Sequence, residues 1–136
     1  MEREAFWSRF LATRELLVKL ALAILAVVLA SPAHAQSDDA GQLLFNNACR
    51  TCHSVKDGDN RLGPNLHGIV GRKSGSLKNY GYSDSMAKSD LVWDKPTLDR
   101  FIANPEAVVR GNAMQPYGGI ASADDRVKII AYLEQN

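Results

Sequence analysis

Apolar residues recur at helical spacing near the middle of the chain, directly before its only two cysteines. Within residues 38–50, Ala40, Leu44 and Ala48 fall one turn apart, and two aspartates precede the stripe as candidate caps. Residues 38–50 are therefore predicted to form an α-helix that buries one face.

A second helical pattern lies at the C-terminal end. Ser122 and Asp125 form a capping-box pattern, with aspartate in place of the usual glutamate. The positions after this cap predict a buried stripe made of Val127, Ile130, Ala131 and Leu133. This final helix is the clearest element that the pattern predicts.

Two shorter helices are predicted between these ends. One covers residues 83–88, and the other starts near Asp94, where Pro96 suits the first helical turn. The Asn104-Pro105 pair should end the second one, because the residue before a proline avoids helical geometry.

The remaining segments are rich in glycine and proline. Residues 54–80 carry five glycines and a proline, and residues 107–120 are again predicted as loop. Loops of this length in a small domain usually wrap something, and a flat cofactor is the natural candidate. The predicted fold class is all-α, with helices and long glycine-rich loops around one cofactor.

The first 35 residues have the features of an export signal. A charged start leads into an 11-residue apolar run, Leu20 to Ala30, and then into Ala33-His34-Ala35, which fits an A-x-A cleavage site. A membrane-spanning helix needs about 20 apolar residues. We predict a cleaved signal peptide over 1–35 and a single periplasmic domain over 36–136. A retained inner-membrane tether that faces the periplasm is the alternative.

The domain predicted to remain after cleavage has a balanced charge. The leader takes four of the 16 basic and three of the 15 acidic residues, which leaves 12 of each. A balanced domain gives no indication of nucleic-acid binding. A domain of 101 residues builds only a thin core, and small domains often depend on a metal or a crosslink.

The candidate chemistry lies in Cys49-Arg50-Thr51-Cys52-His53. A C-x-x-C-H run is the attachment signal for c-type haem. Each thiol forms a thioether with one haem vinyl group, and the histidine that follows presents its imidazole to the iron. The sequence therefore predicts one covalently attached haem c, with His53 as an iron ligand.

Other readings of Cys49, Cys52 and His53 fit less well. A disulfide between positions 49 and 52 would close a tiny loop and add little stability. A thioredoxin-like redox pair expects βαβ units, which the pattern does not show. A zinc site would need His67 as its fourth ligand, and the adjacent Cys52 and His53 converge poorly on one tetrahedral ion.

The second iron ligand has three candidates in the exported part of the chain. Met114 lies in a loop rich in glycine and proline, which can lay a thioether against the face of a haem. Met86 falls in a short helical stretch, where methionine usually packs. His67 follows a turn and suits a hydrogen bond to loop backbone. Met114 is the predicted ligand, and the other two remain alternatives.

Further segments match one known family in order and spacing: Gly41, Phe45, Gly63–Gly68, Gly71–Gly75, Val92-Trp93, Thr97-Leu98, Asn104-Pro105 and Ile129–Leu133. On these residues the chain resembles the class I cytochromes c, near bacterial cytochrome c2 and the mitochondrial type, over residues 40–136. The resemblance implies that Gly41 and Phe45 let the first helix cross the last one tightly, near Ile129 and Tyr132.

The resemblance also implies roles around the haem. Pro64 would accept a hydrogen bond from the ring of His53 and so fix its tautomer. Tyr82 and Trp93 would hydrogen-bond a haem propionate, and Arg72 would offset the charge of that propionate.

The chain departs from the family at several positions. Arg110-Gly111-Asn112-Ala113 stands before the methionine where Pro-Gly-Thr-Lys is common, and Phe101 replaces a frequent tyrosine over the haem. Positions that carry lysine around the haem edge in the mitochondrial type are here Ala48, Glu106, Ala107 and Ala113. A strong positive docking face is therefore not expected.

As function, the resemblance implies a monomeric one-electron carrier that is not an enzyme. The expected partners are redox proteins: membrane respiratory complexes, an oxidase or periplasmic dehydrogenases. Two alternatives stay open, a haem enzyme or gas sensor with an open iron site, and a membrane-tethered subunit of a larger oxidoreductase.

Overall fold

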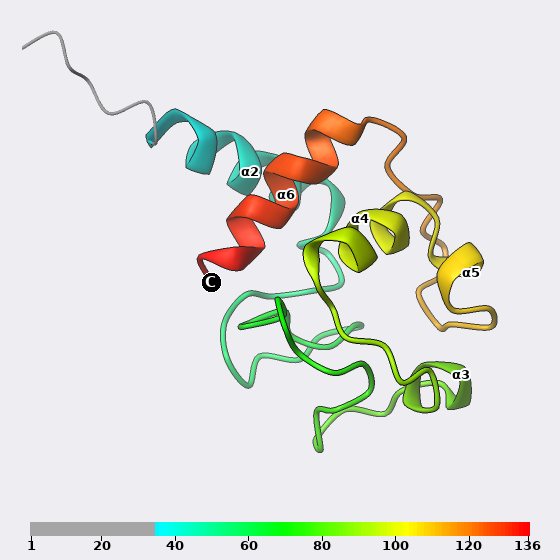
Figure 1. Cartoon of the computed structure of the whole chain (residues 1–136). Coiled ribbons are helices and arrows are strands. Elements are labelled where there is room, and N and C mark those ends of the chain that lie inside the picture. Colours follow the sequence, from blue (N-terminus) through cyan, green and yellow to red (C-terminus); the bar gives the residue numbers. More distant parts are fainter. Residues whose placement is uncertain (1–34) are drawn as a thin grey trace, which may run out of the picture. The chain divides into compact units, whose positions relative to one another are not determined.

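The computed structural model describes residues 35–136, and its side chains from Asp39 onward. In this range five helices are joined by long loops (Figure 1): α2 (Ala35–Ala48), α3 (Asp84–Ala87), α4 (Lys95–Ala103), α5 (Pro105–Val108) and α6 (Ala123–Glu134). The described range holds no strand beyond an isolated bridge between Lys73 and Val92. The predicted all-α class is confirmed. The apolar run at 20–30 lies outside the described residues, and so does the cleavage motif at 33–35 except for Ala35.

Side-chain caps fix where the helices begin. The Asp94 carboxylate accepts a hydrogen bond from the Thr97 amide at 2.7 Å, and the Ser122 hydroxyl accepts one from the Asp125 amide at 3.2 Å. Caps of this kind satisfy amides that have no partner inside the helix. These two predicted helix starts are confirmed, whereas the first helix begins at Ala35, so the aspartates predicted to cap it at 38 and 39 lie inside α2.

The prediction that residues 107–120 are all loop is wrong at its start. Asn104 ends α4, as predicted, but it also caps α5, because its side-chain oxygen accepts a hydrogen bond from the Ala107 amide at 3.2 Å. Pro105 occupies the first turn of α5, where a missing amide hydrogen costs nothing. One asparagine therefore serves two consecutive helices.

Helices α2 and α6 cross at Gly41 (Figure 1). A Cβ atom on Gly41 would lie 2.5 Å from the Lys128 carbonyl oxygen and 2.9 Å from the Tyr132 Cβ. One turn along, the Phe45 and Tyr132 rings pack with their centroids 5.4 Å apart. The close crossing that the resemblance implied is present.

Two predicted stripes are shifted from their true buried faces. On α6, Val127 is 62% exposed, and the buried residues are Ile129, Ile130 and Leu133. On α2, Gly41 and Phe45 are buried while Ala48 is exposed. Each helix packs against specific neighbours, and the contact with those neighbours, more than the apolar spacing alone, decides which side is buried.

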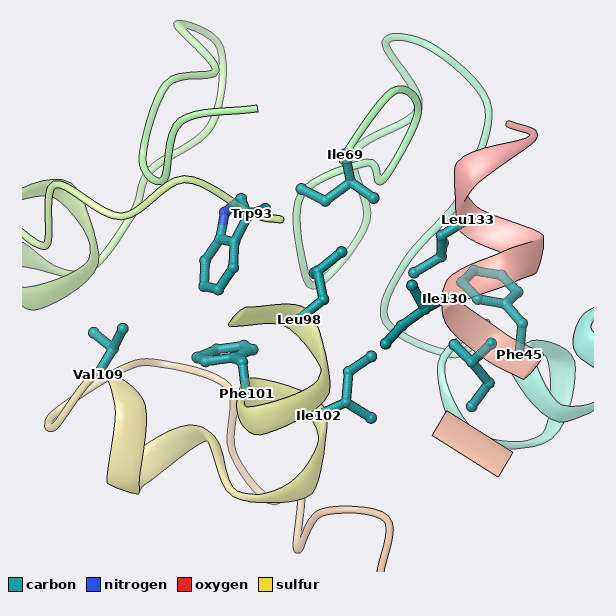
Figure 2. Close-up of a cluster of buried hydrophobic side chains, with 10 residues drawn as sticks. Phe45, Ile69, Trp93, Leu98, Phe101, Ile102, Val109, Ile130 and Leu133 are labelled. Atoms are coloured by element: carbon teal, nitrogen blue, oxygen red, sulfur yellow. The ribbon is translucent and has the colours of Figure 1, made fainter. Parts of the chain in front are cut away.

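The core joins α4 to α6 and to the loop before α4 (Figure 2). The rings of Trp93 and Phe101 lie 4.8 Å apart at an interplanar angle of 57°. In Figure 2 these two rings stand apart from the group around Phe45 and α6, with Leu98 and Ile102 of α4 between them. Both groups border the cavity that forms the candidate site.

No helix among the described residues is long and apolar enough to cross a membrane.

Candidate functional site: a haem-sized cavity

A cavity of about 490 Å³ opens among α2, α3, α4, α6 and the loops between them. The sequence predicted eight cofactor-contacting residues, and all of them line this one cavity: Cys49, Cys52, His53, Pro64, Arg72, Tyr82, Trp93 and Met114. His67 does not line it. Residues that lie up to 65 positions apart in sequence are thus brought to a single site.

The two cysteines occupy one wall, where α2 ends in a turn. The amide of Cys52 donates to the Cys49 carbonyl at 3.1 Å, and the amide of His53 donates to the same carbonyl at 2.9 Å. This turn presents both side chains and the following imidazole to the same space. Neither cysteine forms a disulfide, and in the unattached thiol form burial, helped by the nearby Cys52, raises the pKa of Cys49 to about 11.

His53 is 8% exposed, and its ring contacts the loop that follows it, at Gly63 and Pro64. Its Nδ1 lies 2.7 Å from the Pro64 carbonyl oxygen, and since a carbonyl only accepts, Nδ1 carries the hydrogen. Burial lowers the pKa of the imidazole, and the hydrogen bond to Pro64 only partly offsets this effect. A neutral ring with a hydrogen on Nδ1 leaves Nε2 free to bind a metal ion.

Gly63 allows the chain to pass directly under this ring. A Cβ atom at position 63 would lie 2.7 Å from Nδ1 and 2.8 Å from Nε2 of His53. The Gly63 amide also donates to the Cys52 carbonyl at 2.7 Å, which ties the loop to the cysteine turn. The histidine is therefore positioned by the backbone of a loop ten residues further along.

Arg72, Tyr82 and Trp93 lie in a second part of the wall. The Arg72 guanidinium is half-buried and donates to the Asn65 carbonyl at 2.8 Å and to the His67 carbonyl at 3.0 Å. Burial lowers the pKa of Arg72 and raises that of Tyr82, so each charged form is disfavoured. Among the described residues, no carboxylate accepts a hydrogen bond from Arg72. The charge of Arg72 is therefore available to a negatively charged group in this corner.

Backbone pairing links Trp93 to the same corner. The Trp93 amide donates to the Arg72 carbonyl at 2.9 Å, and the Trp93 carbonyl accepts from the Gly71 amide at 3.0 Å. The ring is buried. Sequence reasoning missed Tyr80, which also lines the cavity and packs edge-on against Tyr82 with the ring centroids 4.8 Å apart. The presence of a second tyrosine two positions before Tyr82 was the available signal in the sequence.

Both Met114 and Met86 reach the cavity. Met86 belongs to α3, and its amide donates to the Ser83 cap at 3.3 Å. Met114 lies in the loop between α5 and α6, and its amide donates to the Asn112 side-chain oxygen at 2.9 Å. The lining of the cavity thus contains the imidazole of His53 and the thioethers of Met86 and Met114.

These features fit haem c. Two free thiols and an imidazole with an available Nε2 share one wall, the interior is lined by apolar side chains, and a half-buried arginine can meet a carboxylate. No group of three histidine, cysteine or acidic side chains able to hold a metal ion occurs among the described residues, so they offer no assembled zinc site.

Comparisons with known proteins point to one family. A family model described as cytochrome c oxidase, cbb3-type, subunit III, matches residues 36–133. The chain is 45% identical over 86 residues to cytochrome c2 iso-2 of Magnetospirillum fulvum, which covers 63% of this chain and 88% of that protein. It is 41% identical over 97 residues to cytochrome c of Gibberella zeae, which covers 71% and 91%.

A solved structure agrees with these matches. Cytochrome cH from Methylobacterium extorquens superposes with a TM-score of 0.67 at 36% identity, over 73% of this chain and 98% of that one. Sequence and structure comparisons thus agree over the part of the chain that builds the cavity.

Proposed function

The chain belongs to the class I cytochromes c, and from this premise we propose that its haem iron is bound by His53 and Met114. The protein is a monohaem electron carrier with haem c attached through Cys49 and Cys52. The observation that carries the ligand proposal is the common cavity, which joins His53, with its free Nε2, to Met114 on a loop.

Bound haem c supplies one-electron exchange between the ferrous and ferric states of iron. The chain contributes the conditions for it. His53 and Met114 would together hold the iron, and methionine as second ligand would raise its reduction potential. With no open position, a substrate cannot bind the iron, and this agrees with a carrier and not an enzyme.

The corner made by Arg72, Tyr82 and Trp93 is proposed to hold the propionates. Arg72 already donates to two carbonyls and carries its charge in a half-buried place. A propionate there gains more from this charge than it would in water, because the surroundings are less polar. Tyr82 and Trp93 would add hydrogen bonds from the same wall.

Replacing the two methionines separately tests the ligand proposal. Met114→Ala should open the iron to carbon monoxide and lower the reduction potential, since the methionine ligand is lost. Met86→Ala is the matched control, since Met86 also lines the cavity, and it should do neither. The reverse pattern would move the ligand to Met86. Carbon monoxide binding by the unchanged protein would favour the haem enzyme or gas sensor.

We also propose that residues 1–35 are a signal peptide and that residues 36–136 act in the periplasm. Helix α2 begins at Ala35, so cleavage after this residue would leave the helix essentially whole. Mass spectrometry of the protein from its native compartment should give a chain that starts at Gln36 and carries one haem. A membrane-bound form that keeps residues 20–30 would instead be a tethered cytochrome.

The proposed partners are redox proteins of the respiratory chain or periplasm, met in brief encounters. Three exposed lysines are engaged in ion pairs: Lys73 with Asp90 at 2.7 Å, Lys88 with Asp84 at 3.1 Å and Lys95 with Glu134 at 2.7 Å. Leu62, at the rim of the cavity, is 77% exposed. These features support docking with a small charge contribution.

A further inference from the structure

The loop that carries Met114 is held by a chain of hydrogen bonds that begins outside the cavity, at Glu106 in α5. Both carboxylate oxygens of Glu106 accept from the Gly111 amide, at 3.0 and 3.1 Å. One of them also accepts from the side-chain amide of Asn112 at 3.2 Å. Asn112 then accepts from the Met114 amide at 2.9 Å. Glu106 is therefore linked to Met114 through one intervening side chain.

The partners of Asn112 fix the orientation of its amide. Asn112 is 6% exposed, and its nitrogen donates to Glu106 and to the Val109 carbonyl at 3.0 Å. Its oxygen must then face the Met114 amide. A flipped side chain would set a donor against that amide and an acceptor against two acceptors, which a buried group does not tolerate.

Gly111 is fixed from the opposite side as well. Its carbonyl accepts from the Ser85 hydroxyl of α3 at 2.6 Å, while its amide faces Glu106. Its φ of +76° is one that glycine adopts without strain. The start of the loop is thus anchored between α3 and α5, three residues before the methionine.

We propose that Glu106 is a positioning residue for Met114, holding the loop so that the thioether stays at the iron. This inference rests on the proposed ligand role of Met114. Glu106 stands where the mitochondrial type commonly has a lysine, and Asn112 stands within the altered segment before the methionine. The two departures form one unit, in which the carboxylate orients the asparagine and the asparagine orients the methionine backbone.

Imidazole binding to the ferric holoprotein tests the proposal, because imidazole binds the iron only when the methionine leaves it. Glu106→Ala should raise the affinity for imidazole about five- to tenfold, the effect expected from losing an ordinary net hydrogen bond at an exposed carboxylate. Glu106→Gln, which keeps one acceptor oxygen but places a donor near Asn112, should fall between. Circular dichroism at the same temperature should show unchanged helix content, because Glu106 is exposed.

Asp84→Asn is the matched control. It removes the same charge from an exposed site in α3, where the carboxylate pairs with Lys88. It should leave the imidazole affinity unchanged. Equal effects of Asp84→Asn and Glu106→Ala would show a general charge effect and overturn the proposal. An unchanged affinity in Glu106→Ala would also overturn it.

Met114→Ala separates this proposal from the ligand assignment. If the unchanged protein resists imidazole and Met114→Ala binds it tightly, the assignment stands, and the Glu106 variants alone decide the positioning role. If Met114→Ala binds imidazole no better than the unchanged protein, the ligand assignment fails and takes the proposal with it.

Discussion

The Nδ1 atom of His53 lies 2.7 Å from the carbonyl oxygen of Pro64, and Gly63 packs directly against the same ring. The loop after the cysteine turn therefore sets both the tautomer and the tilt of the imidazole. Gly63 thus acts through its lack of a side chain, because a Cβ atom there would overlap the His53 ring.

Gly63→Ala should destabilise the protein by about 1–3 kcal/mol, because the new methyl group overlaps the His53 ring and forces it or the loop to move. The free energy of unfolding in denaturant measures the effect. Gly118→Ala is the control, since a Cβ at position 118 meets nothing within 4 Å and Gly118 does not line the cavity, and it should change stability by less than about 0.5 kcal/mol. Equal losses in both variants would contradict the close contact.

Arg72→Leu should cost about 1–3 kcal/mol of folding free energy, because two carbonyls lose a charged donor in a half-buried place. The neighbouring Lys73→Leu removes only an exposed ion pair with Asp90 and should cost about 0–1 kcal/mol. Denaturant unfolding of both holoproteins gives the comparison. If the Lys73 variant lost as much folding free energy as the Arg72 variant, the two hydrogen bonds of Arg72 would not explain its effect.

The crossing of α2 and α6 should not tolerate a side chain at position 41. Gly41→Val should cost about 1–3 kcal/mol or more, because its Cβ would meet the backbone of α6 at Lys128. Gln42→Val, at the exposed next position of the same helix, controls for placing a β-branched residue in α2. The midpoint of thermal unfolding should be lower for Gly41→Val than for Gln42→Val. Similar midpoints would argue against a tight crossing.

Local signals in the sequence predicted the local features. Asp94 and Ser122 cap helices through their nearest backbone amides, so their effect is readable without any partner. The C-x-x-C-H run likewise places both cysteines and the histidine within one turn. The resemblance then supplied the more distant members of the site, such as Pro64 and Trp93.

Features that depend on distant partners could not be predicted in the same way. Val127 fits an apolar stripe, yet α6 turns Ile129 inward because it packs on α2 and α4. The ion pairs Lys73–Asp90 and Lys95–Glu134 join residues far apart in the sequence and needed the folded chain, whereas Lys88 pairs with Asp84 only four residues earlier. The link from Glu106 to Asn112 also needed the folded loop, since six residues separate them.

Electron transfer to the physiological acceptor should depend only modestly on salt. The exposed lysines Lys73, Lys88 and Lys95 are already paired with carboxylates, and the positions that resemble the lysine-bearing haem edge of the mitochondrial type are mostly neutral. We expect the second-order rate to fall by less than about tenfold from low to physiological ionic strength, at the small end of electrostatic steering. A steep fall would reveal a concentrated charged face, and no change at all would indicate purely apolar docking around Leu62.

The central claim is that the iron is closed by two ligands from this chain, and carbon monoxide tests it most directly. The reduced, unmodified holoprotein should show no spectral change under carbon monoxide at neutral pH, because the proposal assigns both remaining iron ligands, His53 and Met114, to this chain. Rapid and stoichiometric binding of carbon monoxide would show an open iron and would contradict the account.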